Sequence, residues 1–561
     1  MALVLAARAA AAVRPALKPA LHRSSLQPVA KTSISTTSRR FVATKARLLA
    51  ATHNWLSFTV LTAVVSAPLA LWFLHDGTGI VPDLDKYTAM SECVAKNFKG
   101  PSPEKVTKML NEDAYTVLVG NVANGVTRYD GAQLAAQYPC EDRYTHGSMT
   151  MPPHERWMVW GIFDGYFGPQ MAETLSYVAA TSVRDALKEH FDSMLQEDRQ
   201  GKTENTPKDL SRSAHARIVQ KILRKTMPDL DFELMNSTAI LAEAILRADD
   251  DGSMKEMTAV FANSSFADQV TRALNAWSGA GSLLTMYDPT RDIVHVATTG
   301  KSRAVLGVYE TDKNLRRRIW RARPMSAEQA RLTPKEEDAF RRKHPGEEEV
   351  VLLNGRPFGR PTSHAFGDLR TKLPVSLQQA LCQVFGLDVS LTWPIKESKT
   401  PPYMNAKPST SFVEIRNRPC FLIMASDGFW QYMTDQNAVD LVTFWLAAGS
   451  MALDKGHPGK LNTIDISRYI SRDSSRADVR SLEATPIQGP LDLTTPYRHD
   501  TMAVKDGNAT VHLIRNALGG SNAGLLATRL AFQPPYARMW RDDMTVQVIF
   551  FHMDALALLK F

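Results

Sequence analysis

Residues 157–165 read WMVWGIFDG, and this stretch indicates the fold class more clearly than any other part of the chain. Seven uncharged residues precede Asp164, which is the pattern of a short buried strand that ends at a polar turn. The pattern recurs twice. The apolar run Cys420–Met424 leads to Asp427, and the largely apolar run Met544–Phe551 directly follows the pair Asp542-Asp543. Three predicted strands therefore each carry an aspartate at one end.

Other segments show strand and helix patterns in no regular alternation. Leu283–Tyr287 and Ile293–Ala297 flank a short polar turn and predict a β-hairpin. Residues 175–191 place apolar side chains three and four positions apart, which predicts an amphipathic helix; residues 436–447 and 508–518 also have helical patterns. Because strands and helices do not alternate as in a parallel βαβ sheet, the sequence favours an α+β domain of packed layers.

The aspartates at strand ends are candidates for a metal site. A carboxylate in this position is held rigidly and can still project into a cleft, and Mg²⁺ and Mn²⁺ prefer oxygen ligands of this kind. Asp164, Asp427 and Asp542 are so placed, and a further acidic pair, Glu141-Asp142, follows a short polar stretch. Asp-Gly at a strand end also forms simple turns. Position alone therefore leaves a metal site and a structural turn both open.

Seven segments of the body follow one another in a distinctive order. They are QLAAQYPCEDR (133–143), WGIFDGYFG (160–168), GAGSLLTM (279–286), VATTGKSRAVLG (296–307), the stretch from LTPKEEDAFRRKHP to AFGD (332–368), FLIMASDGFW (421–430) and RDDMTVQVIFF (541–551). In their residues and their order along the chain, these segments resemble the metal-dependent protein serine/threonine phosphatases of type 2C, over residues 130–552. The resemblance implies a four-layer α-β-β-α sandwich, with two central antiparallel sheets flanked by helices.

Local features place the chain near one branch of that family. TPPY (400–403), ATVHLIR (509–515) and Arg541-Asp542-Asp543, where RDN is commoner, are similar to the mitochondrial pyruvate dehydrogenase phosphatases. This resemblance implies hydrolysis of phosphoserine or phosphothreonine in proteins through a metal-bridged hydroxide. It suggests pyruvate dehydrogenase as the phosphoprotein substrate.

The resemblance also implies roles for individual residues. Asp164 would bridge two Mg²⁺ or Mn²⁺ ions. The other implied ligands are the Gly165 carbonyl, Asp427 and Asp542, with Glu141 and Asp142 holding metal-bound waters. The family's usual phosphate-clamping arginine is Gln137 here, so Arg143 becomes a candidate for gripping the substrate phosphate, with simple solvation as its alternative.

Three positions depart from the family pattern. Tyr166 replaces the histidine that helps to protonate the leaving group, and a phenol with an ordinary pKa near 10 is poorly matched to that task. Lys301 and Gln431 replace acidic residues of a third, weaker metal site, which is therefore expected to be lost. Two hypotheses follow: a phosphatase that works with two metal ions, or a catalytically impaired pseudophosphatase with a regulatory or scaffold role.

The formal net charge of +8 is concentrated at the N-terminus. Residues 1–50 contain nine basic side chains and no acidic one, so residues 51–561 carry a formal charge of −1. A body so close to neutral argues against nucleic-acid binding. Residues 1–47 have the Arg-, Ala- and Ser-rich composition of a mitochondrial transit peptide. The four cysteines include no C-x-x-C pair, which argues against a disulfide framework or a thiolate zinc site.

Residues 55–74, WLSFTVLTAVVSAPLALWFL, carry no charge and are long enough for a transmembrane helix. Basic residues precede this segment and acidic residues follow it, so the positive-inside rule predicts an inner-membrane anchor with the body in the intermembrane space. Pyruvate dehydrogenase as a substrate implies the matrix side instead, and a secretory signal anchor is a third reading. The predicted order is a transit peptide (1–47), a membrane helix (55–74), a linker with the start of the domain (75–125) and a phosphatase domain (126–555) with insertions near 195–240, 370–410 and 450–500.

Overall fold

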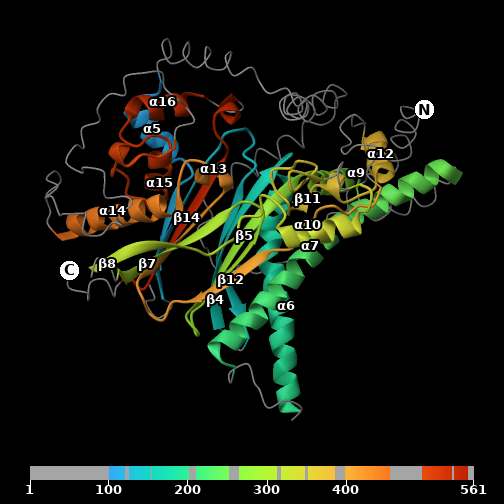
Figure 1. Cartoon of the computed structure of the whole chain (residues 1–561), viewed down its shortest axis with the longest axis horizontal. Helices are drawn as coiled ribbons and strands as arrows, with labels where there is room; N and C mark the ends of the chain where they lie inside the picture. Colours follow the sequence, from blue (N-terminus) through green and yellow to red (C-terminus); the bar gives the residue numbers. More distant parts are fainter. Residues whose placement is uncertain are drawn as a thin grey trace, which may run out of the picture. The chain divides into compact units, whose positions relative to one another are not determined.

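The computed structural model describes residues 100–119, 125–152, 155–200, 210–251, 265–312, 317–347, 352–385, 399–454, 496–532 and 536–553 (Figure 1). The expected transit peptide (1–47), the expected membrane helix (55–74) and the first part of the linker lie outside these residues. Across the described ranges, no helix has both the length and the apolar character needed to span a membrane.

The first sheet contains six strands among the described residues, each antiparallel to its neighbours. In spatial order they are β1 (Tyr115–Leu118), β2 (Val126–Leu134), β14 (Met544–Phe551), β13 (Cys420–Ala425), β7 (Arg303–Asp312) and β8 (Arg317–Pro324). Every residue of the central strands β13 and β14 is buried, because both of their faces are covered. The two strands predicted in this sheet are therefore confirmed.

The second sheet is also antiparallel throughout. Its strands are β12 (Ser409–Glu414), β6 (Ile293–Thr299), β5 (Gly279–Asp288), β4 (Glu155–Tyr166) and β3 (Arg143–Met151), with β11 (Phe366–Gly367) beside β5. β9 (Leu352–Leu353) and β10 (Arg356–Pro357) form a separate ribbon. The predicted hairpin is β5–β6. The Asp288 carboxylate shapes its turn by accepting hydrogen bonds from the backbone N–H groups of Thr290 (3.0 Å) and Arg291 (3.1 Å).

The helices include the three predicted from periodicity. The predicted helices correspond to α6, α14 and α15. The α-helices of the described residues are α5 (Pro103–Leu110), α6 (Gln170–Arg199), α7 (Arg212–Asp251), α9 (Phe266–Trp277), α10 (Pro334–Lys343), α12 (Val375–Phe385), α13 (Asp427–Trp430), α14 (Asp435–Asp454), α15 (Ala509–Ala517) and α16 (Ala523–Ala531). The segment expected as an insertion near 195–240 is helical where it is described, since it holds the end of α6 and much of α7. Most of the segment near 450–500 lies outside the described residues.

An apolar layer joins the two sheets. Trp160 and Ile162 from β4 belong to the same buried cluster as Leu422 from β13 and Ile549 from β14. Side chains of a strand alternate between its two faces, so the opposite faces of these sheets remain to be covered by helices.

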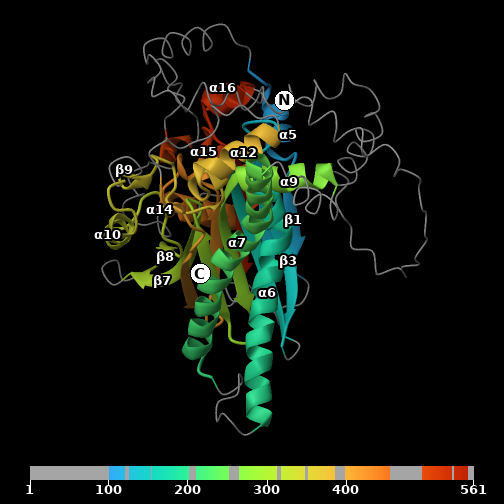
Figure 2. The same ribbon diagram turned by 90° about the vertical axis from the view of Figure 1, so that its right-hand side faces the viewer.

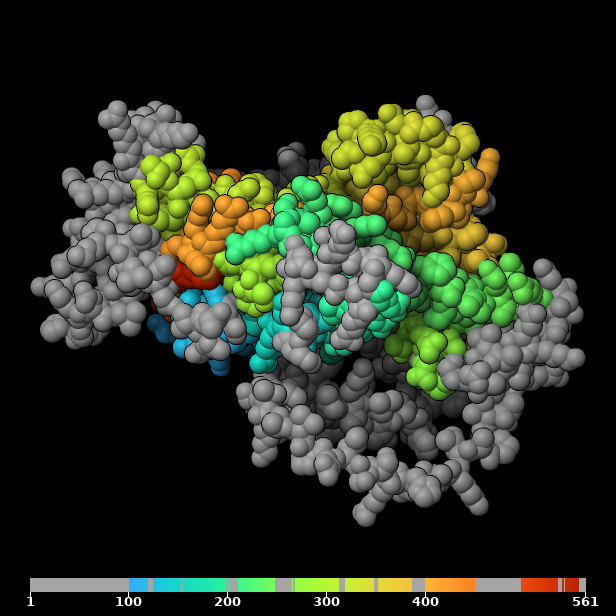
Figure 3. All heavy atoms as spheres, turned by 90° about the horizontal axis from the view of Figure 1, so that it is seen from below, coloured from blue at the N-terminus to red at the C-terminus, as the bar shows by residue number. Residues whose placement is uncertain are grey.

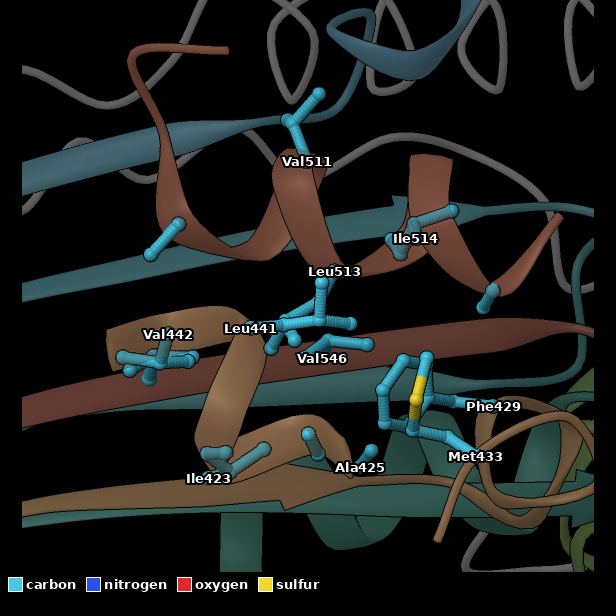
Figure 4. Packing of buried hydrophobic residues seen from close by; sticks show 14 of the residues in the cluster. Ile423, Ala425, Phe429, Met433, Leu441, Val442, Val511, Leu513, Ile514 and Val546 are labelled. Atoms are coloured by element: carbon cyan, nitrogen blue, oxygen red, sulfur yellow. The ribbon is translucent and has the colours of Figure 1, made fainter. Parts of the chain in front are cut away.

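Helices cover both outer faces. α14 and α15 pack on the first sheet, where Leu441 and Leu513 meet Ile423 and Val546 (Figure 4). α6 and α7 lie along the second sheet (Figure 2) and form part of the molecular surface seen from below (Figure 3). The result is the four-layer α-β-β-α arrangement that the sequence resemblance implies.

Candidate active site

The ends of two strands bring Asp164 and Asp427 together. Asp164 lies near the end of β4, opposite Gly281 of β5, and Asp427 is the first residue of α13, two residues after the end of β13. The backbone N–H of Asp427 donates to Asp164 Oδ2 at 3.4 Å. This contact links the two sheets at the place where the sequence predicts a metal site.

Two glycines allow the neighbouring chain segments to approach these aspartates. A Cβ atom on Gly165 would lie 2.4 Å from the carbonyl oxygen of Glu141, and one on Gly428 would lie 2.2 Å from the carbonyl oxygen of Asp543. Both distances are shorter than van der Waals contact allows. The Asp-Gly pairs at 164–165 and 427–428 are therefore required for close backbone packing at the site, not only for a turn.

Glu141 and Asp142 are both buried beside this contact. The backbone N–H of Gly168 donates to Glu141 Oε1, whereas Glu141 Oε2 is buried without a hydrogen-bond partner. Burial raises the pKa of Glu141 to about 7. Asp142 accepts a hydrogen bond from Thr545 Oγ1 at 2.8 Å, yet burial, and then repulsion from Asp164, raises its pKa well above the ordinary value.

The Asp164 carboxylate is itself poorly compensated. Burial and then the negative charge of Asp427 raise its pKa to about 7, against a lesser opposing effect of Lys301. A group of this kind is ionised only at a cost in free energy unless a cation lies close to it. The site therefore combines several carboxylates whose mutual repulsion favours a positive ligand.

Two side-chain cations of the protein lie on these carboxylates. The Lys301 ammonium pairs with Asp427, and the Arg538 guanidinium pairs with Asp542. Burial opposes the charge of Lys301, but Asp427 and Asp164 together outweigh it and raise the pKa of the ammonium. Lys301, which stands where the family pattern has an acidic residue, thus places a positive charge against Asp427.

Asp543 is a structural member of the site that the sequence analysis did not identify. Its carboxylate is 2% exposed and accepts hydrogen bonds from the backbone N–H groups of Ala136 (2.5 Å) and Glu141 (2.8 Å). It therefore anchors the loop that carries Glu141 and Asp142. The sequence feature that could have identified Asp543 is its place immediately before β14, a strand whose residues are all buried.

Tyr166 and Arg143 are not directed at the paired aspartates. The Tyr166 hydroxyl donates to Asp368 Oδ2 at 3.3 Å, and burial followed by the Asp368 charge raises the pKa of the phenol well above its ordinary value. Arg143 Nη1 donates to the carbonyl oxygens of Cys140 (2.6 Å) and Asp142 (2.8 Å), so this guanidinium holds the backbone of the acidic loop. Gln431 ends α13, where its backbone N–H bonds to the Asp427 carbonyl at 3.0 Å.

The donor chemistry suits Mg²⁺ or Mn²⁺. The acidic groups are hard oxygen ligands, and one buried oxygen, Glu141 Oε2, has no partner. In the part of the chain that the structure describes, no three Asp, Glu, His or Cys side chains are grouped closely enough to form a ready metal site. Because Lys301 and Arg538 hold two of the carboxylates, a metal ion would have to displace them.

Comparison with known proteins gives a consistent result. The family model described as protein phosphatase 2C matches residues 148–456. A protein phosphatase 2C homolog of Schizosaccharomyces pombe is 30% identical over 477 residues, which cover 84% of this chain and 91% of the relative. Pyruvate dehydrogenase (acetyl-transferring)-phosphatase 1, mitochondrial, of Saccharomyces cerevisiae is 28% identical, with 77% and 70% covered. The human mitochondrial phosphatase 2 of the same name is 26% identical, with 81% and 84% covered.

Proposed function

Because this chain belongs to the protein phosphatase 2C family, whose members are metal-dependent protein serine/threonine phosphatases, we propose that it hydrolyses phosphoserine and phosphothreonine in a mitochondrial phosphoprotein. The observation that carries the proposal is the contact between Asp164 and Asp427, with Glu141 and Asp142 buried beside it. These four carboxylates come from three separate parts of the chain, and Asp427 among them pairs with Lys301. Burial raises the pKa values of Glu141, Asp142 and Asp164, which favours the binding of a further cation.

Asp164, Asp427 and Asp542 would hold Mg²⁺ or Mn²⁺, supported by Glu141, Asp142 and the Gly165 carbonyl. When bound, two such ions lower the pKa of water and offset charge on the phosphoryl oxygens. The protein's contribution is to fix these donors on strand ends, and Asp543 holds the loop that carries two of them. Lys301 retains a positive charge beside Asp427, where the family has a third ion.

The names of two relatives support pyruvate dehydrogenase as the substrate and the mitochondrion as the location. Residues 1–47 would direct import and residues 55–74 would anchor the chain in the inner membrane. The side of the membrane is decided by protease treatment of mitoplasts that carry a C-terminally tagged chain. Digestion of the tag places the domain in the intermembrane space and excludes pyruvate dehydrogenase, a matrix enzyme, as a direct substrate.

The activity is tested by phosphopeptide hydrolysis with Mg²⁺ or Mn²⁺. Asp164→Asn should reduce the rate by at least about 100-fold, since even groups that only support metal ligands contribute 10- to 100-fold. Asp185→Asn is the matched control, because Asp185 is an exposed residue on α6 that pairs with Arg184. Hydrolysis by the wild type that is unaffected by Asp164→Asn would disprove the assignment.

A second function, that of a pseudophosphatase, is favoured by two observations. The Tyr166 hydroxyl donates a hydrogen bond to Asp368, and the Lys301 ammonium forms an ion pair with Asp427. If the wild type has no activity and the double variant Tyr166→His with Lys301→Asp gains it, the chain is a regulatory or scaffold protein. Clear wild-type hydrolysis that depends on Asp164 excludes this alternative.

A further inference from the structure

A second ionic cluster lies beside Tyr166 and has the opposite charge. Its members are Arg360, Arg370 and Asp368, which we call the arginine cluster. Asp368 Oδ1 accepts a hydrogen bond from Arg370 Nε at 3.1 Å, and Asp368 Oδ2 lies 3.5 Å from Arg360 Nε. Two guanidinium groups thus share a single carboxylate.

The fold ties this cluster to the candidate active site. β11 pairs with the start of β5, so Gly367 lies opposite Gly279, and Gly279 in turn lies opposite Tyr166 of β4. Asp368 follows at once, with a left-handed φ of 51°, and its backbone N–H donates to the Ser278 carbonyl at 3.0 Å. The cluster is therefore fixed at the end of β4, two residues beyond Asp164.

The positive charge of the cluster is not balanced. The side chains of Arg370 and Asp368 have no exposed surface, and that of Arg360 is 11% exposed. Arg370 Nη1 and Nη2 and Arg360 Nη2 are buried without a hydrogen-bond partner. A buried charge that lacks a partner costs several kcal/mol. Burial accordingly lowers the pKa of Arg370 to about 10.

Aromatic rings hold the guanidinium groups in place. Arg370 lies over the ring of Phe167 at 3.4 Å and over that of Trp277 at 5.6 Å, and Arg360 lies over Phe167 at 4.5 Å. These contacts offset part of the burial cost. They act on the face of the guanidinium and leave the N–H groups at its edge available for an acceptor.

We propose that Arg360 and Arg370 form a binding site for a phosphate-type oxyanion. Guanidinium N–H groups match the oxygen spacing of phosphate, and an anion would balance the second buried arginine. Arg360 is the member of the cluster with exposed surface, so an anion would approach the cluster from its side. Resting on the proposed function, we assign the oxyanion to a phosphoryl group of the phosphoprotein substrate, which reaches the cluster beside Tyr166.

The test is calorimetric titration of the full-length protein with inorganic phosphate in EDTA at constant ionic strength. EDTA removes metal ions, so that phosphate cannot bind through them. The wild type should bind saturably, and Arg360→Gln should weaken binding at least about tenfold, because a hydrogen bond to a charged group contributes 1.5–3 kcal/mol. Arg498→Gln, which removes the same charge from an exposed pair, should have no effect.

Asp368→Asn provides a test that does not depend on losing a buried arginine. Removal of the single carboxylate should tighten phosphate binding, whereas general damage to the fold would weaken it. Absence of saturable binding, or equal affinity in the wild type and Arg360→Gln, overturns the proposal.

The source of the oxyanion is decided by repeating the titration with a phosphopeptide and its unphosphorylated form. Competition between the phosphopeptide and inorganic phosphate supports the substrate assignment. Binding of inorganic phosphate alone supports the site and overturns that assignment in favour of free phosphate. Since no arm of the experiment requires hydrolysis, the anion site and the phosphatase activity fail or succeed separately.

Discussion

The two ends of the strand pair β4–β5 carry the same kinds of charged side chain in different balance. At the start of β4, Arg291 Nη1 contacts Glu155 and Asp288 at 3.2 Å each, and both carboxylates are largely buried. At the opposite end, Asp164 meets Asp427, and burial and repulsion raise the pKa of Asp164 to about 7. We call the first end balanced because both of its carboxylates form ion pairs with Arg291, and the second unbalanced because Asp164 has no ion pair among the described residues and its pKa is raised. The balanced end stabilises a turn. The unbalanced end leaves a carboxylate available to a ligand, as expected of a binding site.

The largest effect is expected at the balanced end. Arg291→Leu leaves Asp288 buried without its cation, and should lower the free energy of unfolding by about 3–5 kcal/mol. Urea denaturation measures this change. Arg498→Leu, in an exposed pair with Asp500, is the control and should change stability by about 0–1 kcal/mol. A loss below that range for Arg291→Leu would mean that this end is not held by its ion pairs.

Local patterns in the sequence predicted the strands that carry these charged residues but not the contacts between them. The hairpin β5–β6 follows from two apolar runs around a polar turn, and the strand that ends at Asp164 follows from its uncharged residues. The contacts of the charged side chains do not follow from such patterns, since Glu155 is 136 positions from Arg291 and Asp543 is 402 positions from Glu141. Such contacts depend on the pairing of strands and the packing of sheets between distant segments, which no local pattern encodes.

The site residues follow the same division. The strand-end positions of Asp164 and Asp427 left a metal site and a turn both open, and the family resemblance predicted that the two residues lie together, as they do. Two contacts were not predicted. The orientation of Tyr166 toward Asp368 depends on a side-chain rotamer, and the pairing of Arg538 with Asp542 involves a segment that carries no strand signal.

The second expected effect concerns two histidines that lie near the balanced end. His215 stacks on Phe191 and His295 stacks on Trp157, and burial lowers the pKa of each to about 3. The unfolded chain binds protons below about pH 6.5, whereas the folded protein does not until about pH 3. Each histidine should therefore remove about 2 kcal/mol of stability as the pH falls from 7 to 5. Protonation of Asp164 and Glu141, whose pKa values burial raises to about 7, acts in the opposite direction over the same range.

Urea denaturation at pH 7 and pH 5 measures this dependence. The variant His295→Phe keeps an aromatic ring against Trp157 and removes one titrating group. Between pH 7 and pH 5, the free energy of unfolding of the variant should change by about 2 kcal/mol in the favourable direction relative to that of the wild type. An equal change in the variant and the wild type would mean that His295 has the same pKa in the folded and unfolded chain.

A gain in stability is expected at the unbalanced end. Asp164→Asn removes a buried, repelled charge and keeps the size of the side chain, so in EDTA at pH 7 it should raise the free energy of unfolding by about 1–2 kcal/mol. The same variant should abolish phosphopeptide hydrolysis. A loss of stability in EDTA would contradict the view that the buried charge of Asp164 destabilises the fold when no metal ion is bound.

The smallest effect is expected for Lys301→Met, and its sign should depend on metal. In EDTA the substitution removes the ammonium that pairs with Asp427, which should lower stability by about 1 kcal/mol, since the pair is partly exposed. With Mn²⁺ the variant should gain more in melting temperature than the wild type, because the ion no longer competes with the lysine for Asp427. If both proteins gain equally, Lys301 does not occupy a cation subsite.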